Sequence, residues 1–104
     1  MSQDGLTDGE ILKQVRDLVA KGKVVWTGHS EQRIAQYGLA REQITDCLLR
    51  GIYEDNPVVP NRTGPLQYSF RMRCRMEGVV IRVAASLYPD SHVVVITVID
   101  PRER

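Results

Sequence analysis

The sequence predicts an α+β fold in which N-terminal helices pack on one face of a four-stranded, mostly antiparallel sheet. Apolar residues recur at helical spacing as far as about residue 50 and at every second position after it. Short runs of Gly, Pro, Asn and Asp separate the alternating segments, as they do between hairpin strands. The 104 residues, 42% of them hydrophobic, fit one domain spanning 1–104 with frayed ends at 1–6 and 101–104.

The first predicted helix begins at a capping box, because Thr7 is followed three residues later by Glu10. Apolar residues then follow at helical spacing, namely Ile11, Leu12, Val15, Leu18 and Val19. Gly22 can end this helix in a left-handed turn. The apolar run 24–26 is short, so we expect it to form only an extended link.

Two further helices are predicted, over about 27–37 and 41–50, and a glycine follows each of them. The later helix places Ile44, Cys47 and Leu48 on one face. Only a short link joins the two helices, which is typical of antiparallel neighbours.

Four strands follow, and the alternating patterns place them at 52–55, 66–76, 79–88 and 92–99. Turn chemistry at 56–57 and 60–65 predicts an irregular loop after the first strand. The predicted hairpin turns are Glu77-Gly78 and Asp90-Ser91.

A two-residue turn at Glu77-Gly78 determines which residues face each other in the long hairpin. It pairs Cys74 with Ile81, Met72 with Val83 and Phe70 with Ala85. All of these residues are apolar, as a sheet face buried under helices requires. The opposite face then carries arginines and hydroxyl groups, namely Ser69, Arg71, Arg73, Arg75, Arg82, Ser86 and Thr97.

In this register Arg73 lies opposite Arg82, and like charges facing each other destabilise a sheet by about 0.2–1 kcal/mol. An anion between the two guanidiniums would reverse that effect, and phosphate suits the position because guanidinium binds its oxygens in a bidentate way. We therefore take Arg75, Arg82 and the rim residue Tyr88 as candidate substrate-binding residues. The alternative is a solvated face, or ion pairs from Arg75 and Arg82 to the acidic residues at 54–55.

His29 and Arg33 form the other candidate site. With Thr27 as N-cap, His29 falls in the first helical turn, and Arg33 lies one turn later on the same face. An imidazole can take a proton from a ribose 2′-hydroxyl, and such general base catalysis contributes about 10²–10⁴-fold. The alternative is that His29 only caps or orients the entry to the helix.

Composition argues against several classes of protein. The net charge of +1 gives no bulk attraction to nucleic acid, so a basic surface must come from local clustering. No apolar run approaches about 18 residues and the polar N-terminus is unlike a signal peptide, so we expect no membrane span and a cytoplasmic location. Cys47 and Cys74 are expected as free thiols in a reducing compartment, with a disulfide as the alternative. Together with His29 and His92 they lack metal-ligand spacing, so neither a metal nor a cofactor is expected.

The segment 24–99 resembles a known family in three stretches. His29-x-x-x-Arg33 is followed by Tyr37-Gly38-Leu39-Ala40 and by a sheet ending in Val95-Ile96-Thr97-Val98-Ile99. These stretches are similar to a widespread prokaryotic domain of unknown function, which looks like a member of the barnase–EndoU–colicin–RelE nuclease group with its RelE-like and MqsR-like toxins. The resemblance implies a RelE-like fold, cleavage of messenger RNA without metal, and a zinc-finger antitoxin as partner. It also implies an active site made of His29, Arg33, Arg71 or Arg73, and Thr97.

We therefore expect a metal-independent endoribonuclease, the toxin-like component of a toxin–antitoxin pair. His29 would act as general base or acid. Arg33, with Arg71 or Arg73, would stabilise the charge that develops on the phosphoryl oxygens, and Thr97 would position one of them. Two alternatives stay open: a catalytically silent RNA- or protein-binding module of the same fold, and an interaction subunit whose unpaired last strand adds to a partner's sheet.

Overall fold

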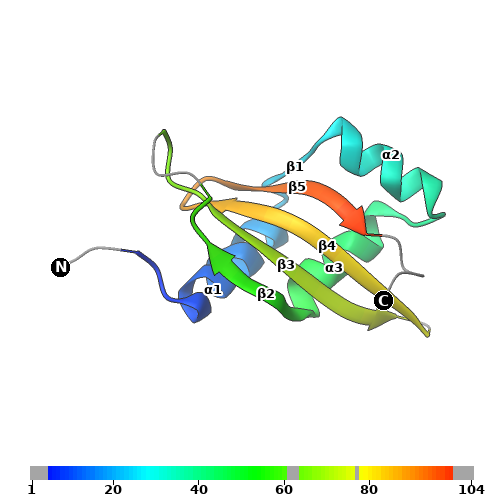
Figure 1. Ribbon diagram of the computed structural model, residues 1–104, viewed down its shortest axis with the longest axis horizontal. Coiled ribbons are helices and arrows are strands. Elements are labelled where there is room, and N and C mark those ends of the chain that lie inside the picture. Colours follow the sequence, from blue (N-terminus) through cyan, green and yellow to red (C-terminus); the bar gives the residue numbers. More distant parts are fainter. Residues whose placement is uncertain (1–4, 61–63, 77, 100–104) are drawn as a thin grey trace.

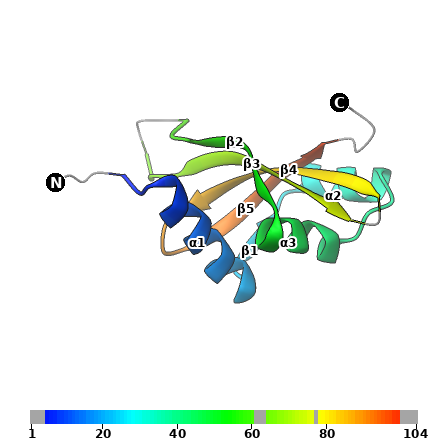
Figure 2. The same ribbon diagram turned by 90° about the horizontal axis from the view of Figure 1, so that it is seen from below.

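Within residues 5–60, 64–76 and 78–99, which the computed structural model describes, the chain forms three helices and a five-stranded mixed sheet. The helices are α1 (Asp8–Ala20), α2 (Gly28–Gln36) and α3 (Arg41–Arg50), and the strands are β1 (Val24–Trp26), β2 (Ile52–Val58), β3 (Tyr68–Met76), β4 (Val79–Tyr88) and β5 (His92–Ile99). The order across the sheet is β1-β5-β4-β3-β2, and α1 and α3 lie together under one face (Figure 1; Figure 2). The predicted α+β class is confirmed, whereas the predicted four strands are wrong because the sheet has five.

The additional strand is β1, a segment expected to be only an extended link. It pairs in parallel with β5 and matches Val24 to Val93, Val25 to Val94 and Trp26 to Val95. Three residues are too few to show a period-two pattern, and the partner strand is distant in sequence, so this pairing leaves no local signal. It also places β5 between β1 and β4, so the expectation of an unpaired last strand is wrong.

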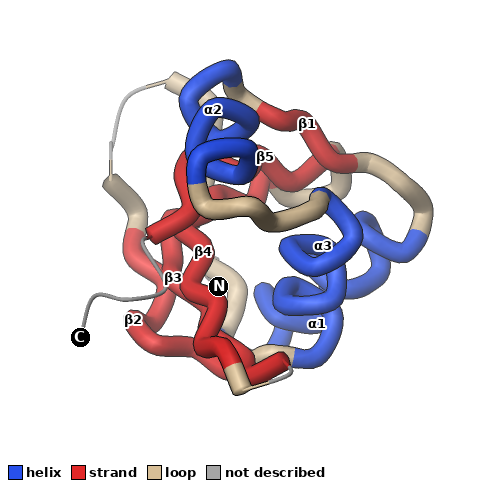
Figure 3. The backbone as a smooth tube through the Cα atoms, turned by 90° about the vertical axis from the view of Figure 1, so that its right-hand side faces the viewer, coloured by secondary structure: helices blue, strands red, loops and turns tan. Residues whose placement is uncertain are grey.

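The helices occupy two different positions. The capping box of α1 is present, since the Thr7 hydroxyl accepts from the amide of Glu10 (3.1 Å) and the Glu10 carboxylate accepts from the amide of Thr7 (2.8 Å). α1 and α3 bury apolar side chains in the core under the sheet, namely Ile11, Val15, Leu18, Val19, Ile44, Cys47 and Leu48. α2 instead packs chiefly on β5, on the side of the sheet where β1 and β5 lie (Figure 3). The expectation that the helices all cover one face is wrong for α2, which buries only Ser30 and Ile34.

The predicted hairpin register is confirmed along β3 and β4. The apolar pairs are Cys74 with Ile81, Met72 with Val83 and Phe70 with Ala85, and they lie on the face that α1 and α3 cover. All except Cys74 are buried, and Cys74 is half-buried near the end of β3. Arg73 faces Arg82, so the like charges are opposed as predicted.

The pairing of β4 with β5 contains a bulge that the sequence analysis does not predict. Ala84 pairs with Thr97 as expected, but Ala85 pairs with Val95, which leaves Ile96 as the extra residue. Ile96 is 40% exposed. At the predicted turns, Gly78 and Asp90 have positive φ angles (81° and 61°), whereas position 77 lies outside the described residues.

Two strand boundaries differ from the prediction. β2 continues through Asn56 and Pro57 to Val58, where an irregular loop is predicted, and its pairing with β3 is interrupted twice. Pro57 has no N–H to donate, and it is tolerated because β2 is an edge strand, whose outward positions need no hydrogen-bond donor. β3 starts at Tyr68 rather than at position 66. Positions 61–63 of the predicted loop lie outside the described residues.

Leu6 contacts the body of the domain. Its amide donates to the Tyr68 hydroxyl (2.9 Å), and its side chain packs against the core. The fraying of 1–6 and 101–104 stays a prediction, since 1–4 and 101–104 lie outside the described residues. No helix in the described part of the chain is long and apolar enough to cross a membrane.

Candidate functional site

The sheet face opposite α1 and α3, called the open face below, carries most of the predicted site residues. Strand alternation places six of them there: Arg71, Arg73 and Arg75 of β3, Arg82 and Tyr88 of β4, and Thr97 of β5. Arg71, Ala84 and Thr97 form one cross-strand row. The Thr97 side chain is half-buried, and its hydroxyl lies 3.4 Å from the carbonyl of Val98.

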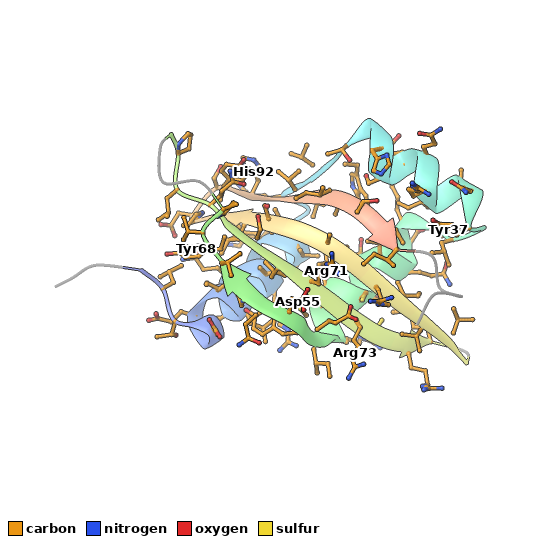
Figure 4. The ribbon with its side chains drawn as sticks, in the orientation of Figure 1. Tyr37, Asp55, Tyr68, Arg71, Arg73 and His92 are labelled. Carbon is orange, nitrogen blue, oxygen red and sulfur yellow. The ribbon has the colours of Figure 1, made fainter. Side chains whose placement is uncertain are left out.

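Carboxylates of β2 reach into this arginine cluster. Glu54 accepts three contacts from the guanidinium of Arg82, at 2.9 and 3.0 Å from Nε and 2.6 Å from a terminal nitrogen. Asp55 lies 3.4 Å from Nε of Arg71 (Figure 4). The alternative of ion pairs with the acidic residues at 54–55 therefore holds for Arg82, whereas Asp55 pairs with Arg71 rather than with Arg75. The Glu54 carboxylate thus partly neutralises the like charges of Arg73 and Arg82, which a phosphate was expected to neutralise.

The environment of Glu54 favours its charged form. Hydrogen bonds from Arg82 lower the pKa of Glu54 below its ordinary 4.5; burial opposes this, and the charges of Arg82, Arg71 and Arg73 add to it. The Glu54 and Arg82 side chains are 23% and 16% exposed, so the pair is largely shielded from solvent. Loss of the carboxylate would remove the Glu54 counter-charge from Arg82 in a poorly solvated position.

We expect Glu54→Gln to lower the free energy of unfolding near pH 7 by about 1–3 kcal/mol, because it weakens charge-assisted hydrogen bonds. The folded-state pKa is depressed, so the stabilisation is fully present above pH 4.5 and is lost as pH falls through the folded-state pKa. Urea unfolding of both proteins from about pH 7 to about pH 3 measures this, and the difference should shrink toward acid. Asp55→Asn is the control, since the Asp55 side chain is 62% exposed and its pair contributes little. A difference for Glu54→Gln that is constant across this range would contradict the assignment.

A shallow groove of about 370 Å³ crosses the open face from β2 to β5. Its lining includes Asp55, Val58, Ser69, Arg71, Ala84 and Ile96. The groove therefore connects the Arg71–Asp55 pair with the bulge of β5. Part of its lining is apolar and part is charged, which suits a ligand with both flat apolar and anionic groups.

The start of α2 is attached to that bulge. The Thr27 hydroxyl donates to the carbonyl of Ile96 (3.0 Å) and accepts from the amide of Ser30 (3.0 Å), so Thr27 is the N-cap, as predicted. His29 is the second residue of this helix and is exposed. The helix turn that bears His29 is thus held beside the β5 end of the groove.

Arg33, the other predicted site residue of α2, has a hydrogen-bond partner four residues further along the chain. A terminal nitrogen of Arg33 donates to the Tyr37 hydroxyl (3.0 Å), and both side chains are half-buried. Tyr37 therefore packs at the end of α2. The structure brings Arg71, Arg73 and Thr97 onto one face but places His29 and Arg33 on α2, which packs beside β5. The two predicted groups of site residues are neighbours rather than a single cluster.

Tyr88 has a partner of its own at the end of the open face. Its ring stacks on His92 with centroids 4.8 Å apart and an interplanar angle of 13°. The Ser91 hydroxyl lies 2.6 Å from Nδ1 of the same histidine. The aromatic surface expected to stack a base is thus one half of a Tyr–His pair at the β4–β5 turn.

A second and larger pocket, of about 570 Å³, lies between the end of α3 and the end of β3. Asp46, Arg50, Arg73, Cys74 and Arg75 contribute to its lining. No pattern in the sequence predicts this site, because it arises only from the packing of α3 beside β3. The cysteines are free, as expected, and burial raises the pKa of both Cys47 and Cys74. Within the described ranges no three His, Cys, Asp or Glu side chains lie close enough together to hold a metal ion.

Comparison with known proteins gives a family. A family model described as "Domain of unknown function (DUF4258)" matches residues 26–100, from the last residue of β1 to just past β5. Neither the curated proteins nor the solved structures gave a match. The matched segment contains α2, α3, the open face and both pockets, and covers well over half of the chain. This protein therefore belongs to the DUF4258 family of domains of unknown function.

Proposed function

We propose that the protein is a metal-independent endoribonuclease with a RelE-like fold, acting on single-stranded RNA laid across the open face. One observation carries this proposal. The groove that contains Arg71 ends at Ile96, and the carbonyl of Ile96 anchors the helix turn that bears His29. A phosphodiester in the groove would thus have the Arg71 guanidinium on one side and the start of the helix that bears His29 near its other end.

The spacing of the arginines supports an extended single strand. Arg71, Arg73 and Arg75 alternate along β3, so they stand about 6.8 Å apart, an interval comparable with that of successive phosphates in an extended strand. Arg73 and Arg75 are exposed, and the ion pairs found among the described residues of this face involve Arg71 and Arg82. Exposed guanidiniums in a row form the kind of electrostatic groove that tracks a nucleic-acid backbone.

The chemistry follows from these groups. His29 takes the proton of a ribose 2′-hydroxyl, and the 2′-oxygen attacks the adjacent phosphorus. The bond from phosphorus to the 5′-oxygen breaks, and this oxygen takes a proton from the protonated imidazole or from water. Arg33 and Arg71 or Arg73 stabilise the charge on the phosphoryl oxygens, and Thr97 orients one of them. The products are a 2′,3′-cyclic phosphate and a 5′-hydroxyl end.

The direct test is incubation of purified protein with a labelled single-stranded RNA in the presence of EDTA. We expect cleavage that leaves cyclic phosphate ends, and weaker RNA binding for the double variant Arg73→Gln, Arg75→Gln with a shallower dependence of affinity on salt. The control is Lys13→Gln with Lys21→Gln, which removes the same charge from exposed positions on or beside α1. Absence of both cleavage and binding would overturn the proposal.

A second candidate is an RNA-binding module without catalysis. It is favoured by the ion pairs of Arg71 and Arg82, which make these guanidiniums less available to a reacting phosphate, and by the position of His29 outside the open face. It predicts RNA binding that depends on Arg73 and Arg75, with no cleavage by the wild type. The same RNA experiment separates the two functions.

The proposed toxin-like role implies a partner protein. By resemblance, that partner is a zinc-finger antitoxin acting with this protein in the cytoplasm. Co-expression with the product of a neighbouring zinc-finger gene would test it, with co-purification and suppressed RNA cleavage as the expected result. Unchanged cleavage in the presence of that product would contradict it.

A further inference from the structure

The pocket between α3 and β3 has a thiol in its wall. The pairing of β2 with β3 begins at Ile52, which lies opposite Arg73. β3 therefore continues past the start of β2, and this end of β3 has no β2 residues beside it (Figure 1). Cys74 is half-buried there and lines the pocket of about 570 Å³. That volume lies within the range of about 300–1,000 Å³ that is typical of small-molecule sites.

The rim of this pocket is predominantly positive. Arg50 comes from the last turn of α3. Arg73 and Arg75 flank Cys74 in β3; they belong to the open face and border the pocket along the edge of β3 that β2 leaves uncovered. All three arginines are exposed. Asp46 is the acidic residue in the lining. Three guanidiniums against one carboxylate favour a ligand that carries carboxylates, because guanidinium binds them in a bidentate way.

A second thiol lies directly behind the first. Sγ of Cys47 is 3.5 Å from the carbonyl oxygen of Ile81, and Ile81 is the cross-strand partner of Cys74. Cys47 therefore lies next to the strand position that pairs with Cys74. Cys47 is fully buried, so a reagent from solvent meets Cys74 first. The two cysteines of the chain are thus arranged as an outer and an inner thiol.

We propose that Cys74 is a site of thiol–disulfide exchange with small disulfides that carry carboxylates, such as oxidised glutathione, and that Cys47 resolves the adduct into a Cys47–Cys74 disulfide. This site goes beyond the proposed RNA chemistry and does not rest on it.

The exchange balances in two steps. Cys74 loses its proton to solvent, and its thiolate attacks one sulfur of the disulfide, which breaks the S–S bond and releases one glutathione thiolate. Cys47 then loses its proton and attacks the Cys74 sulfur of the mixed disulfide, which releases the second glutathione. Two protein thiols are oxidised and one glutathione disulfide is reduced to two thiols. Because burial disfavours the Cys74 thiolate, the attraction of an anionic disulfide to the arginine rim matters for the rate.

The experiment is a time course of the native protein with oxidised glutathione, or with cystamine as a cationic disulfide, followed by acid quench and mass spectrometry of the intact and digested protein. We expect the wild type to pass through a glutathionyl adduct on Cys74 to a species lacking two hydrogens. Cys47→Ser should stop at the adduct, and Cys74→Ser should stay unmodified while folded. Cys47→Ala is expected to stop at the same adduct as Cys47→Ser, and it replaces the buried thiol with an apolar group, which the core accepts better than a serine hydroxyl.

The arginine rim is tested by the ratio of the glutathione rate to the cystamine rate. The double variant Arg50→Gln, Arg75→Gln should lower this ratio by about tenfold, as expected when charge attraction is removed. Arg41→Gln, at the opposite end of α3, is the matched control and should leave the ratio unchanged. The proposal is overturned if Cys47 is modified before Cys74, if the wild-type adduct never resolves, or if the ratio is the same in the double variant.

Discussion

Replacement of His29 by alanine should lower the rate of RNA cleavage by about 10²–10⁴-fold, the usual contribution of a general base. RNA affinity should change little, because the phosphate contacts come from the arginines of the open face. His29 is exposed in the first turn of α2, where it supports neither the core nor the Thr27 cap, so the variant should fold normally. Single-turnover cleavage of labelled RNA in EDTA measures the effect.

His92→Ala is the matched control, since His92 is the other histidine of the chain. It stacks on Tyr88 at the β4–β5 turn, whereas α2 starts beside the bulge at Ile96. Its cleavage rate should stay close to that of the wild type. Equal rates for wild type and His29→Ala would remove His29 from the mechanism, and an equal loss in both variants would indicate a nonspecific effect of histidine removal.

Gly51→Ala should destabilise the fold by about 1–3 kcal/mol, the usual cost of forcing atoms into a packed position. A Cβ at this position would lie 2.5 Å from the carbonyl oxygen of Cys47 and 2.6 Å from that of Arg73. Both contacts are with backbone atoms, so no side chain can rotate away. The φ of Gly51 is −76°, which any residue can adopt, so the penalty is steric and not conformational.

Urea unfolding of Gly51→Ala against the wild type measures this cost. Gly9→Ala in α1 is the control, because nothing lies within 4 Å of the Cβ it would introduce. Alanine is the better helix former, so Gly9→Ala should be neutral or more stable by as much as about 1 kcal/mol. Wild-type stability of Gly51→Ala would contradict the close approach of the α3 end to β3.

The β3–β4 hairpin was predictable because its signal is local. A turn of known length combined with period-two alternation determines every cross-strand pair, and a slip by one residue would have buried Arg71 and Arg73. All the predicted pairs occur. The capping box at Thr7 and Glu10 is equally local, since both partners lie within one helical turn.

The candidate site was predictable only in part. Alternation placed the arginines on one face, but the register of β2 with its irregular pairing decided that Asp55 meets Arg71 and that Glu54 reaches Arg82. The position of α2 depends on the attachment of Thr27 to Ile96, which joins residues 69 apart in sequence. No pattern within either segment encodes that contact.

By itself, the sequence determined the class of the fold, the limits of the helices, the hairpin register and the face on which the arginines lie, because spacing along the chain controls each of these. The tertiary structure alone decided that β1 closes the sheet beside β5, that α2 packs beside β5, and that Cys47 lies against Ile81, the cross-strand partner of Cys74 in the wall of a pocket. These features arise from contacts between segments far apart in the chain, where packing of the whole core selects the arrangement and local preferences do not.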